Sequence, residues 1–456
     1  MTTLARALLA LALLSPLPLA AQRSDSLAAA PAPPTDSSAR PISLDEAIRL
    51  AKRNAPAAVQ ARGTERTSRA AVTSAYGAFI PNVSVSLGGV RQFTGAGDRT
   101  RINPQTNAVE TLSPAPWSYS SGLSLNLNLF EGGSRIYGVR SAKAGVRAAE
   151  ASAVAQEFDV ALSVQQQYFA VLAAHESEAA ARAQLEEAQQ QLTTSSAKLR
   201  AGAATTSDSL RSVIQVGNAQ LALLNAQTAL RNADAALTRL VASPVPVTAQ
   251  ESDSLDVAAA VALDSATLAR LAAEGPAVRQ AAAQLGAASA SAKAARAPYL
   301  PTVTASYSRA GSGTDPRFGY GSDPYQYNGR LSLGLSYPLF NQFTREESVV
   351  RARVAEDNAE ATLRDTRLAA QQQLVQALST LRTAQQQIAI QQASVSAAEE
   401  DLRVQRQRYQ LGASTLLDVL TSQTQLAQAR SALIQARYDA RVARAQLEAV
   451  IGQELP

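Results

Sequence analysis

Cysteine is absent from this chain of 456 residues, and histidine occurs once, at His175. The absence of Cys excludes disulfides and thiol catalysis, and a single His excludes metal clusters built on Cys and His ligands. Aromatic residues make up only 5%, and the formal net charge of +5 comes without a Lys/Arg cluster of the nucleic-acid-binding type. We therefore expect no metal, no other cofactor and no nucleic-acid partner, and we expect His175 to be a surface residue.

Long apolar runs are missing as well, except at the start of the chain. Arg6 precedes an apolar run at residues 7–14, Pro16 interrupts it, and Ala20 and Ala21 stand before Gln22. This order is typical of a secretory signal peptide, which we place at residues 1–21. Residues 22–41 are rich in Ala, Pro and Ser and are expected to form a flexible leader. No later run reaches 18 apolar residues, so no transmembrane helix is expected.

The clearest positive feature is an internal duplication. The landmarks that recur, at offsets of 220 and then 210 residues, are Pro56 and Pro276, Pro81 and Pro301, Phe130 and Phe340, Gly202 and Gly412, and Asp208 and Asp418. We place the two repeats at residues 42–243 and 262–453, with a linker at 244–261. Each Phe lies 72 residues before its Gly, which indicates a rigid element, whereas the stretch before each Phe differs by ten residues and behaves as a loop.

Each repeat contains two segments in which apolar residues alternate with small polar residues. This period of two predicts strands at 82–91 and 118–130, and again at 302–310 and 328–339, each with one apolar face. Strands of this length cross a bilayer when tilted, although a soluble hairpin has the same pattern. Four strands cannot close a barrel, so a transmembrane barrel would have to be shared among chains. Aromatic residues that could form an interfacial girdle are Phe93, Trp117, Tyr119, Tyr307, Tyr325, Tyr327 and Tyr337.

Pro is absent between Trp117 and Ser243 and between Leu339 and Leu455. These stretches predict long helices at 134–201 and 344–411 and return helices at 206–242 and 415–451. A seam that recurs every seven residues consists of Leu374, Leu381, Ile388, Val395 and Leu402. Such heptads with many Ala between them predict antiparallel coiled-coil packing, and a helix of about 70 residues is about 100 Å long. A fibrous coiled coil would share these helices but not the strands.

Both long helices end at a Gly, Gly202 or Gly412, which can adopt the left-handed conformation of a helix C-terminus. Thr205 and Thr415 follow as expected N-caps, and Asp208 and Asp418 occupy the capping-box position three residues later. These features indicate helical corners, and a functional role for them needs other grounds.

These segments, taken in order, resemble the TolC family of outer-membrane efflux and secretion channels. The motifs that carry the resemblance are AFIP at 78–81, FEGG at 130–133, Tyr409 with Gly412, and LDVL at 417–420. The resemblance covers nearly the whole mature chain, in both repeats. It implies a mainly α fold with a small β part: a trimer whose chains each give four strands to one transmembrane β-barrel, and whose helices continue as a periplasmic α-barrel.

The resemblance also implies roles for the two corners. The candidates for contact with a periplasmic adaptor protein are Gly202, Ala203, Thr205, Gly412, Ala413, Ser414, Thr415 and Leu417. The candidates for the pore constriction and its gate are Asp418, Asp208, Tyr409 and Thr421. Thr421 stands where the family's second entrance carboxylate falls, and Ser414 where it has a latching Arg, so we expect a less acidic constriction and a weaker latch. The second repeat reads FNQF at 340–343 and lacks the Gly pair, so the two strand exits are not expected to share one geometry.

The function implied is a passive exit duct in the outer membrane of a Gram-negative-type cell, with a long periplasmic portion. Its expected partners are two further copies of the chain, outer-membrane lipid, a periplasmic adaptor and a proton-driven or ATP-driven inner-membrane pump. The cargo would be small molecules such as drugs or metals, or polypeptides in a type I secretion system. The alternative is a non-conducting, envelope-spanning coiled-coil scaffold. An enzyme is not expected, because carboxylates such as those at 399–401 lie among Lys and Arg on a solvated helix face.

Overall fold

The computed structural model describes residues 39–91, 100–102, 105, 107–111, 117–202, 204–250, 264–315, 326–453 and 455. The predicted signal peptide, most of the predicted leader and most of the predicted linker lie outside the described residues. So do Ala203, Phe93 and Tyr325 among the residues singled out above.

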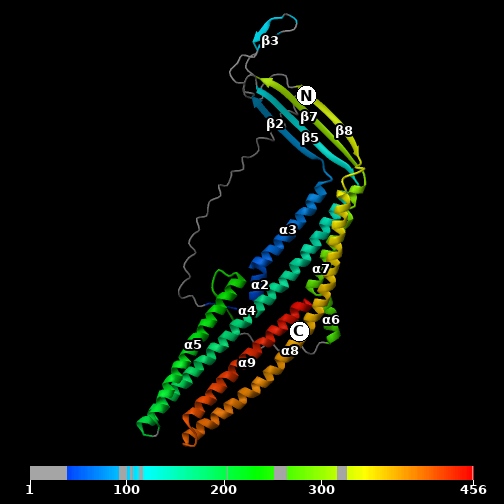
Figure 1. Ribbon diagram of the computed structural model, residues 1–456. Helices are drawn as coiled ribbons and strands as arrows, with labels where there is room; N and C mark the ends of the chain where they lie inside the picture. The colour runs from blue at the N-terminus through cyan, green and yellow to red at the C-terminus, as the bar shows by residue number, and fades with distance from the viewer. Residues whose placement is uncertain are drawn as a thin grey trace.

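Two long helical hairpins form the lower part of the molecule (Figure 1). Helices α4 (Ser134–Arg200) and α8 (Thr344–Gln410) have 67 residues each, and α5 (Thr206–Val241) and α9 (Leu416–Ile451) return along them for 36 residues each. At 1.5 Å per residue, the long helices extend about 100 Å from the strands to the tip. The predicted class, mainly helical with long antiparallel helix pairs, four strands and a duplication, is confirmed.

Shorter helices complete the upper helical part. The first repeat has α2 (Leu44–Asn54) and α3 (Pro56–Gly77), and the second has α6 (Ser265–Ala273), α7 (Pro276–Ala294) and the 3-10 turn η2 (Ala297–Tyr299). Pro56 and Pro276 open α3 and α7 at the first helical position, where a missing N–H breaks no helical hydrogen bond. Helix α4 packs between α3 and α7, and α7 also packs against α8, so these four helices lie side by side.

The four strands form one antiparallel sheet in the order β2-β5-β7-β8. They are β2 (Asn82–Arg91), β5 (Trp117–Glu131), β7 (Thr302–Asp315) and β8 (Gln326–Ser336). Val83 pairs with Leu125, Leu125 with Tyr307, and Tyr307 with Leu331, so one apolar row crosses all four strands. Strand β7 continues beyond the predicted end at 310, because the GSGTD segment keeps its ladder with β5 although it has no apolar alternation.

A short parallel pair joins segments that were predicted as leader and linker. Strand β1 (Arg40–Ile42) pairs with β6 (Val247–Ala249), which corrects those two predictions at residues 40–41 and 247–249. Tyr168 of α4 holds the pair: its hydroxyl donates to Ile42 O at 3.1 Å and to Gln250 O at 2.8 Å, and its side chain is 1% exposed. The lone His175 is half-buried here rather than at the surface, with Nε2 3.4 Å from Thr248 Oγ1.

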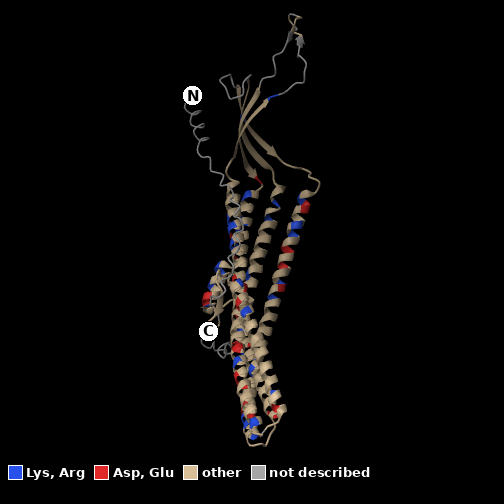
Figure 2. Cartoon of the chain, turned by 90° about the vertical axis from the view of Figure 1, so that its left-hand side faces the viewer, with Lys and Arg blue, Asp and Glu red and all other residues tan. Residues whose placement is uncertain are grey.

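Charged side chains follow the helices and are few on the four-stranded sheet (Figure 2).

Two further short strands, β3 (Thr100–Ile102) and β4 (Val109–Thr111), pair in the connection between β2 and β5. None of the helices in the described part of the chain is both long enough and apolar enough to span a membrane.

The two strand-to-helix exits share a backbone conformation, contrary to the expectation from their sequences. Gly132 and Gly133 have φ of 60° and 82°, and Gln342 and Phe343 have φ of 57° and 60°. The left-handed conformation is costly for residues with a Cβ, at about 1–2 kcal/mol each. Space explains why only the first exit needs Gly. A Cβ on Gly132 would lie 2.2 Å from Ala297 O, whereas the Gln342 side chain is exposed.

We therefore expect Gly132→Ala to destabilise the fold by about 2–4 kcal/mol, the sum of left-handed strain and a backbone clash. Gln342→Ala is the matched control, because it keeps a Cβ at the same φ without a clash, and it should change stability by less than about 0.5 kcal/mol. Denaturant unfolding followed by circular dichroism measures both. Equal effects of the two substitutions would show that the clash at Ala297 is not what selects Gly.

Candidate functional site at the helical tip

Both hairpins end in the same kind of turn. Gly202 and Gly412 have φ of 72° and 74°, a conformation that Gly adopts without strain. The N–H of Gly202 donates to Leu199 O at 3.0 Å, and that of Gly412 to Tyr409 O at 3.3 Å. These bonds close the last turn of α4 and α8, so the sequence signal at both Gly residues corresponds to a true helix end.

A capping box opens each return helix. In the first repeat the Asp208 N–H donates to Thr205 Oγ1 at 3.2 Å, and Asp208 Oδ2 accepts from the Thr205 N–H at 3.1 Å. In the second repeat the corresponding distances between Asp418 and Thr415 are 3.3 and 2.8 Å. Each box satisfies backbone donors that the start of a helix leaves open. The carboxylates at the tip are thus first of all structural groups.

The two tip carboxylates differ in exposure. Asp418 is exposed, and the backbone N–H and then the hydroxyl of Thr415 hold the pKa of its carboxyl below the usual range, with a smaller contribution from Arg408. Asp418 is therefore negatively charged at neutral pH and faces water. Asp208 is half-buried, and its charge acts on Tyr409 of the other hairpin.

Tyr409 is the residue through which the hairpins meet at the tip. Lys198 of α4 places its Nζ 4.0 Å from the centre of the Tyr409 ring, a favourable cation–π contact. Burial raises the pKa of the Tyr409 hydroxyl, and the charge of Asp208 raises it further. That hydroxyl is buried and has no hydrogen-bond partner among the described residues. The charge of Asp208 thus acts on the Tyr409 hydroxyl, and the ring contact of Lys198 joins α4 to α8 at the tip.

Polar contacts further from the tip also tie the hairpins together. Arg406 of α8 pairs with Glu187 of α4 at 3.1 Å, and the Tyr438 hydroxyl of α9 donates to Glu176 of α4 at 2.8 Å. Neither pair nor the Lys198–Tyr409 contact was found from the sequence, because the partners stand more than 200 residues apart. The position of Lys198 in the last turn of α4 was a weak signal, since cations favour that end of a helix.

Two further tip candidates, Thr421 and Leu417, are exposed. Thr421 is exposed, and its hydroxyl donates to Leu417 O at 2.9 Å within α9. Leu417 has 53% of its surface exposed. Ser414 donates to Thr415 O at 3.4 Å, and Arg408 donates to Ala413 O at 3.4 Å.

The described residues contain no group of three or more His, Asp or Glu side chains placed to hold a metal ion. What the tip offers is a pair of rigid corners, an exposed apolar residue and an exposed carboxylate. That arrangement suits contact with another protein and with ions in water.

Comparisons with known proteins identify relatives that share this architecture. The family model of the outer membrane efflux proteins matches residues 47–243 and 267–453. The chain is 28% identical over 420 residues to the pyoverdine export outer membrane protein OpmQ of Pseudomonas aeruginosa, covering 90% of this chain and 83% of that protein. Its fold is similar to that of the outer membrane protein VceC of Vibrio cholerae, with 18% sequence identity and a TM-score of 0.70, over 91% of this chain and 97% of VceC. It is also similar to the CmeC outer membrane channel of Campylobacter jejuni, with 19% sequence identity and a TM-score of 0.72, over 90% of this chain and 85% of CmeC.

The lowered pKa of Asp418 predicts an acid-sensitive tip. The cap contributes its full stability above the unfolded carboxyl pKa of about 3.9 and loses it as the pH falls through the lower folded pKa. Hydrogen exchange of the first turn of α9, corrected for intrinsic rates, should show protection that falls below about pH 4. Asp418→Asn should remove this pH dependence. The same dependence in that variant would mean that another group titrates.

Proposed function

Because the chain belongs to the outer membrane efflux protein family, we propose that three copies of it form the outer-membrane duct of a tripartite efflux pump. The resemblance noted in the sequence is confirmed: this is an outer-membrane channel with a long periplasmic helical portion, and its family consists of transport proteins rather than enzymes. The trimer, its partners and the roles of the tip residues are the content of the proposal.

The observation that carries the proposal is the unfinished sheet. Strands β2 and β8 are its outer strands and have no partner on their outer sides among the described residues. The apolar face is bare: Val83, Val85 and Leu87 are 59–68% exposed, and Leu331, Leu333 and Leu335 are each 73% exposed. Such a face favours lipid, and in lipid an open edge leaves backbone groups unpaired at a cost of several kcal/mol each. Pairing β8 of one copy with β2 of the next removes both edges.

An unfilled helical seam supports the same assembly. Helix α5 packs against α4, and its other side carries Leu210, Ile214, Leu221 and Leu224, which are 59–63% exposed. Their spacing of four, seven and three residues, with Gly217 between, follows the heptad pattern of a coiled coil. Helices α5 and α8 stand at opposite sides of the hairpin pair (Figure 1). The seam of α5 is therefore placed to pack against a neighbouring copy.

At the tip, three copies would gather three Asp418 carboxylates and three Thr421 hydroxyls around one axis. A ring of negative charge in a narrow, water-filled passage favours cations. Asp208, Tyr409 and Lys198 would control how the hairpins separate. The adaptor would contact the corners through Gly202, Ala203, Thr205, Gly412, Ala413, Ser414, Thr415 and Leu417. Of these, Ala203 lies outside the described residues.

Direction and energy would come from an inner-membrane pump, proton-driven or ATP-driven, with which the adaptor connects the duct. The family description favours efflux over polypeptide secretion, and the relative OpmQ is named for the export of pyoverdine. A non-conducting scaffold remains the second candidate, since the coiled coils alone would suit it. Single-channel conductance of the purified trimer distinguishes the two.

Asp418→Ala should bring the cation-over-anion permeability ratio in planar bilayers toward one, because it removes the exposed charge at the tip. Asp418→Asn should have the same effect while keeping a side chain that can cap the helix. Asp357→Ala, which removes an exposed carboxylate from the upper part of α8, is the control and should leave selectivity closer to that of the wild type. Unchanged selectivity in both Asp418 variants would contradict the proposed constriction.

Leu221→Asp should weaken trimer assembly, because it places a charge in the middle of the α5 seam. Burying that charge unpaired would cost several kcal/mol. Asn218→Asp adds the same charge at an exposed position that lies beside the seam rather than in it, and this variant should assemble normally. Mass photometry or native mass spectrometry in detergent gives the fraction of trimer. A fully trimeric Leu221→Asp protein would show that α5 does not face a neighbouring copy.

A further inference from the structure

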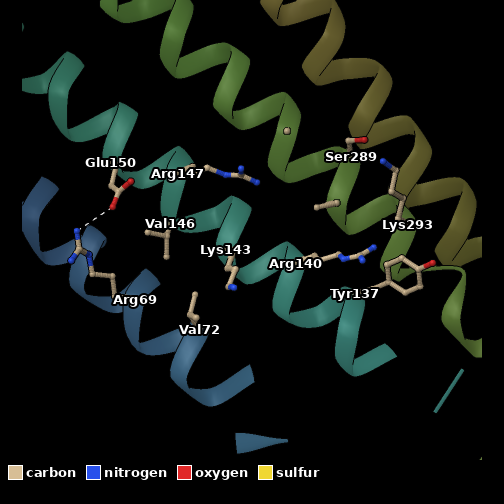
Figure 3. Close-up of a pocket in the computed structure, with 12 residues that line it drawn as sticks. Arg69, Val72, Tyr137, Arg140, Lys143, Val146, Arg147, Glu150, Ser289 and Lys293 are labelled. Carbon is tan, nitrogen blue, oxygen red and sulfur yellow. Dashed lines mark hydrogen bonds and ion pairs between the residues drawn. The ribbon is translucent and has the colours of Figure 1, made fainter. Parts of the chain in front are cut away.

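A cavity of about 890 Å³ lies between α3, α4 and α7, just below the sheet (Figure 3). Its charged lining consists of the cations Arg69, Arg140, Lys143, Arg147 and Lys293 and one carboxylate, Glu150. The proposed duct gives no role to this group, which is far from the tip. Cations that gather around one cavity repel each other unless an anion joins them.

The chain itself neutralises only part of this charge. Arg69 pairs with Glu150 at 3.1 Å and with Glu65 at 2.6 Å, which leaves the lining cations in excess. None of Arg140, Lys143, Arg147 and Lys293 makes an ion pair within the described part of the chain. Two of them lie over aromatic rings: Arg140 Cζ is 5.7 Å from the centre of Tyr137, and Lys143 Nζ is 5.4 Å from that of Tyr76. Such contacts orient the cations without neutralising them.

The cavity continues the apolar surface of the sheet. Leu129 at the end of β5 and Ile136 at the start of α4 are each 54% exposed. Arg140, Lys143 and Arg147 follow Ile136 at intervals of four, seven and eleven residues, so all four lie on one face of α4. At 1.5 Å per residue, the cations lie about 10–20 Å below the sheet. A change from apolar to basic residues along one helix face is typical of a membrane boundary, and the long Arg and Lys side chains can extend upward to the headgroups.

The opposite face of α4 carries small residues, Gly138, Ser141 and Gly145, and Ser141 Oγ lies 3.0 Å from Ser291 Oγ of α7. A Cβ added at Gly138 or Gly145 would have no atom within 4 Å, so crowding does not explain this face. The side that lipid surrounds is instead indicated by Leu129 and Ile136, and the cations project from the α4 face that carries Ile136.

We propose that this cavity binds the phosphate of an anionic phospholipid in the periplasmic leaflet of the outer membrane. Arg140 and Arg147 can each offer two parallel N–H donors to phosphate oxygens, and Lys143 and Lys293 add point charges. Val72 and Val146 also line the cavity and supply apolar contact for the lipid next to its headgroup. The proposal rests on the outer-membrane location of the family and not on conduction.

Native mass spectrometry of the detergent-solubilised trimer, incubated with equal amounts of phosphatidylglycerol and phosphatidylcholine, tests the proposal. The wild type should retain phosphatidylglycerol preferentially. The variant Arg140→Gln, Lys143→Gln, Arg147→Gln should lose that preference by about ten-fold or more, since each cation near a membrane surface contributes to anionic-lipid affinity. Arg364→Gln, Arg367→Gln, Arg382→Gln removes the same charge from exposed positions further down α8 and should keep the preference.

Two further measurements keep the result interpretable. Arg140→Lys with Arg147→Lys retains the charge and should keep most of the preference, which separates a lost site from a misfolded trimer. Free inorganic phosphate at millimolar concentration should not displace the lipid; displacement would mean that the cavity takes a soluble anion and would overturn the proposal. An unchanged preference in the triple Gln variant would overturn it as well. Conductance should be unchanged in that variant, so failure of the lipid site and failure of the duct are distinguishable.

Discussion

The structure depends on a four-stranded sheet whose outer strands, β2 and β8, have no partner on their outer sides in the part of the chain that the structure describes. Four antiparallel strands place a row of apolar side chains across one face, from Val83 through Leu125 and Tyr307 to Leu331. Water disfavours that face, and lipid disfavours the open edges of β2 and β8. A shared closed sheet satisfies both constraints at once, and the helices below must then follow the same symmetry.

The helical part is consistent with this requirement in each repeat. Helices α3, α4, α7 and α8 stand side by side below the sheet, and each connects to one strand, so the wall of helices has the same order as the sheet. The duplication supplies two similar hairpins. Helix α4 contacts the second hairpin through its residues Lys198, Glu187 and Glu176, which hold the two hairpins as neighbours. The seam of α5 remains open within one chain, as the sheet edges do.

Sequence patterns were reliable where structure is local. The alternation of apolar and small polar residues marked the four strands, the Pro-free stretches marked the long helices, and Gly202 and Gly412 marked their ends. Patterns failed where two distant segments decide the outcome. The pair β1–β6 joins residues about 207 positions apart, and the tail of β7 has no apolar alternation of its own. At 342–343 the absence of Gly suggested a different exit, yet the chain adopts the same left-handed turn, because nothing there obstructs a side chain.

The sequence by itself determined the class of protein: a duplicated, exported chain with four amphipathic strands, two long helices and capped corners at 202–208 and 412–418. Each of these is a short-range property, set by periodicity, Pro and Gly placement and capping residues. Only the tertiary structure decided which side chains meet. It placed Lys198 on Tyr409, kept the Tyr409 hydroxyl buried beside Asp208, and gathered Arg140, Lys143, Arg147 and Lys293 around one cavity. Those contacts join residues from different helices, and no local pattern specifies the distance between two helices that pack side by side.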